Sequence, residues 1–276
     1  MAVFERLFTE LFKQKSKKAH LMIMLQFVSA LVTTIFNYFE STGEMKFVLQ
    51  KENGFLPFLF AIFFLFSFLF LPIYLIVTSL QNERINHSQT WRLAPMSDAN
   101  IYLDNTLSSF VNFIYLALLQ TLGSIVLFGL SYLFNKRTKN GWDGMLAAIR
   151  KGNQSRATLT DLLGIVLIAI LLGLLVYLVI SFLNFTSQAI VDFLPAVSSK
   201  FIVTIIRLIL IIAIMWLLTR VYLFVKPIVA SPLSYLLGEK ELELWPAVGL
   251  FTIIDVVLAA VNMFLISKFF EAKQNK

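Results

Sequence analysis

The sequence predicts an all-α integral membrane protein, a polytopic helical bundle of about six spans. Its 276 residues are 58% hydrophobic and only 14% charged, whereas soluble domains carry about 25% charged residues. Several apolar runs reach the roughly 20 residues that a helix needs to cross a bilayer. Cysteine is absent, which excludes disulfides and thiolate chemistry. A water-soluble enzyme is therefore excluded, and residues 1–276 are predicted to form a single domain in the cell membrane.

Residues 1–19 are predicted to form an amphipathic helix lying in the membrane interface. Their large apolar side chains recur at helical spacing and make one stripe: Phe4, Leu7, Phe8, Leu11 and Phe12. A cluster of lysines follows directly: Lys13, Lys15, Lys17 and Lys18. Lysines favour the side of the membrane that carries anionic headgroups and cytoplasmic loops. We therefore expect the N-terminus to be cytoplasmic.

Six apolar segments are predicted to span the membrane: residues 20–39, 55–80, 105–134, 161–183, 201–224 and 247–267. The second is rich in phenylalanine, and we expect these rings to face lipid and neighbouring helices. Pro72 inside it predicts a kink. The third is longer than one crossing needs, so a tilt, a protruding end or a break near Gly123 and Gly129 must absorb the excess.

The basic segment 135–160 makes the topology ambiguous. Within it, the sequence WDGMLAAIRKG predicts a short interfacial helix. Six simple crossings place this segment outside, and Lys and Arg are then equally divided between the two sides. A re-entrant segment 105–134 would return the basic segment to the cytoplasm, as the positive-inside rule prefers. It would also place the lysine-bearing C-terminus outside, and thirty residues are too few to cross twice. We prefer six crossings, and the re-entrant alternative stays open.

Charged residues inside the predicted spans are costly in hydrocarbon and usually face the interior of a bundle. The clearest are Arg207, Arg220 and Asp255. If the last two spans run antiparallel, Asp255 lies closer in depth to Arg220 than to Arg207, so we expect Asp255 to pair with Arg220. The milder polar residues are predicted to form hydrogen bonds between helices: Gln26, Asn112 and Gln120.

Motifs that carry enzyme chemistry are missing from the sequence. It has no phosphate-binding G-x-x-x-x-G-K-[ST] loop, no H-E-x-x-H and no G-x-S-x-G. With two histidines, His20 and His87, a histidine-based metal centre is disfavoured as well. No catalytic residue, cofactor or metal is therefore predicted. The net charge of +7 is attributed to membrane lipids and topology rather than to nucleic acid.

The polar loop after the second span is a candidate docking element. Glu83 and Arg84 leave the membrane there. An amphipathic cluster follows: Trp91, Arg92 and Leu93. Pro95 and Ser97 then predict a turn and the start of a helix, with Ser97 as its N-cap. A solvated connector with an interfacial tryptophan is the alternative interpretation.

The order of these elements resembles the six-span permease subunits of bacterial type-2 ATP-binding cassette exporters. In that family a Glu-Arg pair and a run ending in Leu-x-Pro-x-Ser follow the second span. The matching residues are Glu83, Arg84, Leu93, Pro95 and Ser97. The likeness covers residues 1–134. It departs at 135–160, where the family has a short external connection instead of a long basic one.

The resemblance implies an exporter of an amphipathic substrate such as a peptide, drug or lipid. It implies a separately encoded cytoplasmic ATPase as partner, a homodimer or heterodimer of permeases, and contact with membrane lipids. Residues 83–98 would then form the loop that couples the ATPase to the spans. The alternative is a non-transporting integral membrane protein of accessory or immunity type.

Overall fold

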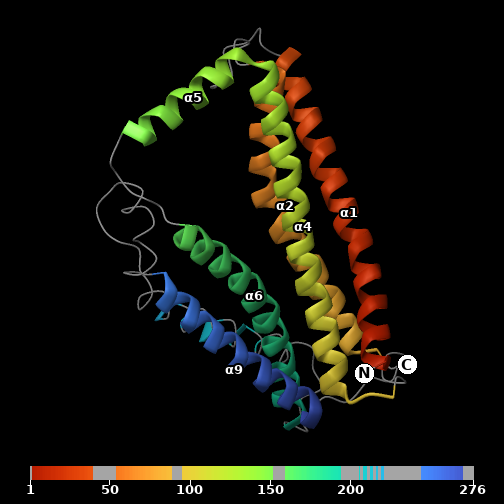
Figure 1. Cartoon of the computed structure of the whole chain (residues 1–276). Coiled ribbons are helices and arrows are strands. Elements are labelled where there is room, and N and C mark those ends of the chain that lie inside the picture. Colours follow the sequence, from red (N-terminus) through yellow and green to blue (C-terminus); the bar gives the residue numbers. More distant parts are fainter. Residues whose placement is uncertain are drawn as a thin grey trace. The chain divides into compact units, whose positions relative to one another are not determined.

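The described part of the chain is helical. The computed structural model describes residues 2–39, 54–88, 95–151, 159–193, 244–269 and isolated positions between 205 and 220. Within these ranges it contains helices and no strand (Figure 1): α1 (Ala2–Phe39), α2 (Phe55–Asn86), α4 (Asp98–Phe134), α5 (Lys136–Lys151), α6 (Leu159–Phe193) and α9 (Trp245–Phe269). All of these except α5 are long and apolar enough to cross a membrane. The helical prediction is confirmed, and the five apolar helices indicate a multi-pass membrane protein.

Five of the predicted spans correspond to α1, α2, α4, α6 and α9. The helices extend beyond the predicted spans because their ends carry polar residues that hydropathy alone assigns to loops; α4, for example, begins at Asp98 instead of 105. The other predicted span, 201–224, lies outside the described residues apart from isolated helical positions. The total of six spans therefore stays a prediction.

A separate N-terminal interfacial helix is not confirmed. Residues 2–39 form one continuous helix of 38 residues, without a break between the amphipathic stripe and the first span. Leu7 and Leu11 of the stripe are buried against Ile85 and Ile101, with Met96 packed beside them. The stripe therefore covers its apolar surface with the end of α2 and the start of α4.

The third predicted span has no internal break. α4 is helical for 37 residues, about 55 Å at 1.5 Å per residue, and it passes through Gly123 and Gly129. A re-entrant segment needs a turn within 105–134, so the continuous helix argues against that alternative. Residues 136–151 of the basic segment that follows form α5, which confirms a helix there; that it lies in the membrane interface stays a prediction.

Contacts between Cα atoms divide the chain into two compact units. Unit 1 comprises Met1–Leu11, Thr78–Phe110 and Ser155–Lys276, and unit 2 comprises Phe12–Val77 and Val111–Gln154. The helices α1, α2 and α4 contribute residues to both. That the whole chain forms a single membrane domain stays a prediction.

Each unit has its own apolar core. In unit 2, Ala30 of α1, Leu59 and Phe63 of α2 and Leu127 of α4 are buried together. In unit 1, α6 packs along α9 through another buried cluster: Leu175, Ala247 and Phe251. Only one side of each apolar helix is therefore buried against neighbouring helices. Many large apolar side chains of the same helices remain exposed.

Candidate functional site

The C-terminal end of α2 carries a charged residue that is held by α6. The carboxylate of Glu83 accepts a hydrogen bond from the Ser181 hydroxyl at 3.1 Å and another from the Asn184 side-chain amide. The side-chain amide nitrogen of Asn184 also lies 3.2 Å from Nε2 of His87, the residue that directly follows α2. Hydrogen bonds to a charged acceptor are stronger than neutral ones. Glu83 and His87 therefore tie this end of α2 to α6 within unit 1.

A neighbouring face of the same helix end is bound to α4. The Asn105 side-chain amide donates to the Asn82 carbonyl at 3.0 Å and to Oδ1 of Asn86 at 2.9 Å. The Ser109 hydroxyl donates to Oδ1 of Asn82 at 2.7 Å. All four side chains are buried, so these bonds replace water for groups that are costly to leave unpaired. Together with Glu83, His87, Ser181 and Asn184, these residues are called the α2-end cluster.

Further polar contacts join the helices of unit 1. The hydroxyls of Thr78 and Tyr177 lie 2.6 Å apart and link α2 to α6. On α9, the Asn262 side-chain amide donates to the Tyr102 hydroxyl at 3.0 Å and to the Leu178 carbonyl at 2.9 Å. The helices of this unit are therefore held in register by directional bonds as well as by apolar contact.

The predicted docking residues fall on both sides of the described boundary. Arg84 and Pro95 are exposed. Ser97 directly precedes α4, and its Oγ lies 3.4 Å from the Asn100 backbone N–H while its carbonyl accepts from the same group at 2.9 Å. Ser97 is therefore the N-cap that the sequence predicts. The remaining docking residues lie outside the described residues: Trp91, Arg92 and Leu93.

The predicted charge pair in the last two spans is not confirmed. Asp255 is 3% exposed, and neither of its carboxylate oxygens has a hydrogen-bond partner among the described residues. The guanidinium of Arg220 lies 5.2 Å from the centre of the Trp216 ring instead, a cation–π contact. Depth in the membrane predicts the pairing, but depth does not determine in which direction a side chain points around its helix. Arg207 lies outside the described residues.

The uncharged polar residues of the spans form hydrogen bonds between helices, as predicted. In unit 2, the Gln120 side-chain amide donates to Oε1 of Gln26 at 2.7 Å, and Gln26 donates in turn to the Ser67 hydroxyl at 2.8 Å. Asn112 donates to the carbonyl of Phe12 at 3.2 Å. These bonds link α1, α2 and α4, which confirms the expected hydrogen bonds between helices.

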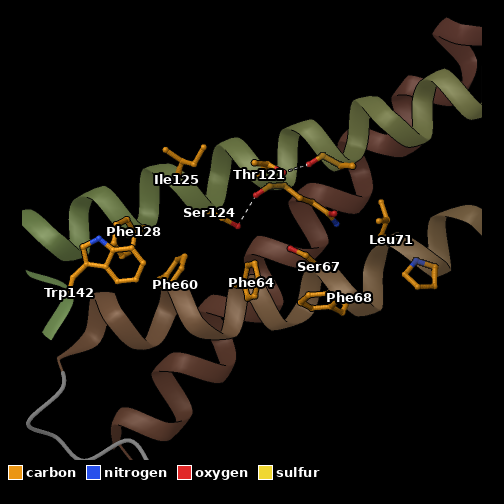
Figure 2. Close-up of a pocket in the computed structure, with 13 residues that line it drawn as sticks. Phe60, Phe64, Ser67, Phe68, Leu71, Thr121, Ser124, Ile125, Phe128 and Trp142 are labelled. Atoms are coloured by element: carbon orange, nitrogen blue, oxygen red, sulfur yellow. Dashed lines mark hydrogen bonds between the residues drawn. The ribbon is translucent and has the colours of Figure 1, made fainter. Parts of the chain in front are cut away.

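Unit 2 also contains a groove that the sequence analysis missed. It is open along one side and has a volume of about 560 Å³. Figure 2 shows side chains from α2 and α4 along it and Trp142 of α5 at one end. The residues that line this aromatic groove are Phe60, Phe64, Ser67, Phe68, Leu71, Pro72, Ala117, Gln120, Thr121, Ser124, Ile125, Phe128 and Trp142. Three phenylalanines of the second predicted span, which were expected to face lipid or neighbouring helices, therefore line the groove: Phe60, Phe64 and Phe68.

Most of the α2-end cluster was missed as well, although the sequence holds a signal for it. Asn82 and Asn86, like Asn105 and Ser109, stand four residues apart, so each pair lies on one helix face. The hydropathy boundary hid Asn82 and Asn86, because it placed them in the loop after the second span, whereas Asn105 and Ser109 fall inside the predicted third span and were not singled out. Phe60, Phe64 and Phe68 also stand four residues apart, so they lie on one helix face. This spacing is the sequence signal for the groove.

No metal site is found among the residues that the structure describes, since no three His, Cys, Asp or Glu side chains gather there. The chain matches no protein-family model, no curated protein and no solved structure. A functional assignment therefore rests on the contacts of the α2-end cluster and on the resemblance carried by residues 1–134.

Proposed function

We propose that the chain is the permease subunit of an ATP-binding cassette exporter and moves an amphipathic substrate across the cytoplasmic membrane. A separately encoded cytoplasmic ATPase supplies the energy, and a second permease copy or a related permease completes the assembly. One observation carries the proposal: the α2-end cluster ties α2 to both α4 and α6 directly beside the segment 83–98 that resembles a coupling loop.

The cluster supports this role because a coupling loop must pass movement to the spans. Glu83 ties the end of α2 to α6, while Asn82 and Asn86 tie it to α4. Ser97 closes the other end of the segment at the first turn of α4. A displacement of the segment between these points is then transmitted to several helices, because buried hydrogen-bonded groups resist separation.

Purification of the tagged full-length chain in a mild detergent tests the proposal. We expect a nucleotide-binding ATPase to co-purify and the complex to hydrolyse ATP. Trp91→Ala should reduce ATPase recovery at least about tenfold, because a buried aromatic contact at an interface is worth ~2 kcal/mol. The matched control is Trp245→Ala, which removes a half-exposed tryptophan at the start of α9 and should leave recovery unchanged.

Two results would contradict the proposal at different points. Recovery of the wild-type chain without any nucleotide-binding protein would favour the non-transporting accessory protein. Full ATPase recovery with monodisperse Trp91→Ala would instead remove the docking role of residues 83–98.

A further inference from the structure

We propose that the aromatic groove of unit 2 is a binding site for an acyl chain of an anionic phospholipid, whose headgroup lies at the basic start of α5. This inference does not depend on the exporter function. It assigns a ligand to a surface that the proposed coupling role does not use.

The shape and lining of the groove suit an acyl chain. Its volume of about 560 Å³ lies in the range of roughly 300–1,000 Å³ that is typical of ligand sites. Aromatic rings form its wall, with Phe60 and Phe128 5.4 Å apart between ring centres and Phe128 and Trp142 4.9 Å apart. The groove walls belong to α2 and α4, and both helices are apolar enough to cross a membrane. Inside a membrane, lipid acyl chains are the most abundant apolar ligand for such a surface.

The few polar groups in the groove do not require a polar ligand. The hydroxyl of Thr121 donates to the Ala117 carbonyl, and that of Ser124 donates to the Gln120 carbonyl, each at 2.8 Å (Figure 2). The Gln120 side-chain amide is bonded to Gln26. Because these donors are already satisfied inside unit 2, a hydrocarbon chain can cover them without leaving a buried donor unpaired.

Charge at the Trp142 end selects the headgroup. Lys139 lies one helical turn before Trp142, and its Nζ is 5.9 Å from the centre of the Tyr132 ring. Lys136 and Lys139 are both exposed. The nearby acidic residue, Asp143, accepts a hydrogen bond from the Tyr132 hydroxyl at 3.0 Å. The start of α5 thus keeps an excess of positive charge beside the open groove, and an anionic headgroup complements it.

Quenching of Trp142 fluorescence by brominated lipids tests the site directly. The other three tryptophans are replaced in the full chain by Trp91→Phe, Trp216→Phe and Trp245→Phe. The protein is reconstituted into phosphatidylcholine vesicles that contain increasing fractions of chain-brominated phosphatidylglycerol or chain-brominated phosphatidylcholine. We expect half-maximal quenching by the anionic lipid at a mole fraction at least about tenfold lower than for the neutral one.

Two pairs of variants separate the groove from the headgroup site. Ser124→Phe fills the groove and should abolish the preference for phosphatidylglycerol, whereas Val126→Phe, at an exposed position of α4 outside the groove, should keep it. Lys136→Gln with Lys139→Gln should also abolish the preference. The control is Lys13→Gln with Lys17→Gln, which removes the same charge from exposed positions of α1.

Three results would overturn the proposal. Equal quenching by the two lipids would mean ordinary contact with bulk lipid. Absence of quenching by either would mean that protein, such as a second copy of the chain, covers Trp142. An unchanged preference in folded Ser124→Phe would place the lipid elsewhere. If Ser124→Phe does not fold, the lysine variants decide, because they leave the groove wall intact.

Discussion

Asp255 and Asn262 show how differently two buried polar residues of one helix can behave. They stand two turns apart on α9, and both are almost completely buried. The side-chain nitrogen of Asn262 donates to two acceptors, the Tyr102 hydroxyl and the Leu178 carbonyl, and only its Oδ1 has no partner among the described residues, whereas neither oxygen of the Asp255 carboxylate has one. An unpaired buried group costs its full desolvation, whereas a paired one contributes a net gain. The two residues should therefore affect stability with opposite signs.

We predict that Asp255→Leu raises the free energy of unfolding by about 1–3 kcal/mol and that Asn262→Leu lowers it by a similar amount. Thermal unfolding of the purified variants in detergent measures both changes. The sequence alone led to the reverse expectation for Asp255, since it placed Arg220 opposite. A lower melting temperature for Asp255→Leu would show that the carboxylate has a stabilising partner.

At the scale of elements, the contact between α2 and α4 in unit 2 depends on one small residue. A Cβ added at Gly123 would lie 3.0 Å from the ring of Phe63, which is 2% exposed. At Gly129, two turns further along α4, an added Cβ meets nothing within 4 Å. Small residues allow helices in membranes to approach closely. A break near these glycines was one of the three ways in which the excess length of the third span could be absorbed, but α4 is continuous there and Gly123 serves helix packing.

Leucine substitutions at the two glycines test this difference. We predict that Gly123→Leu destabilises the protein by about 1–3 kcal/mol, because the buried ring of Phe63 has to move. Gly129→Leu should be neutral or stabilise the helix by up to about 1 kcal/mol, since leucine has the higher helix propensity. Both are measured by thermal unfolding in the same detergent. Equal losses at the two positions would mean that glycine is needed in α4 for its backbone.

The N-terminal stripe shows a different limit at the same scale. Leu7 and Leu11 recur at helical spacing, which predicts an apolar face but not what covers it. The same apolar pattern is expected whether a lipid surface or two neighbouring helices cover this face. In unit 1 the contacts with Ile85 and Ile101 decide in favour of helices.

For the whole molecule, the continuity of α4 makes a prediction about topology. If α1, α2 and α4 each cross the membrane once, α5 lies on the side opposite to the N-terminus, hence outside. The chain has no cysteine, so single substitutions can be labelled selectively. Lys139→Cys and Gly144→Cys, the latter with open space around the new Cβ, should react with a membrane-impermeant maleimide in intact cells.

Lys13→Cys is the matched control, because Lys13 is exposed on the N-terminal part of α1. It should react only after lysis. The reverse pattern at Lys139→Cys and Gly144→Cys would place α5 in the cytoplasm, as the distribution of basic residues prefers, and would require an even number of crossings before it.

Sequence alone determined the helical class, the positions of five long apolar helices and several local contacts. Apolar run length is sufficient for the helices, because a backbone in lipid must satisfy its own hydrogen bonds. The Ser97 cap followed from local chemistry at one helix end. That Gln26 and Gln120 form hydrogen bonds between helices followed from the cost of leaving amides unpaired in apolar surroundings, whereas their pairing with each other did not.

Only the tertiary structure decided which helix each polar or aromatic side chain meets. Asn82 and Glu83 are adjacent in sequence, yet Asn82 is bonded to α4 and Glu83 to α6. Asp255 has a suitable depth for Arg220, yet neither of its carboxylate oxygens has a hydrogen-bond partner among the described residues. The aromatic groove exists because faces of α2 and α4 and the side chain of Trp142 come together. Helical spacing fixes the face on which a side chain lies, but the neighbour of that face is set by packing between segments distant in sequence.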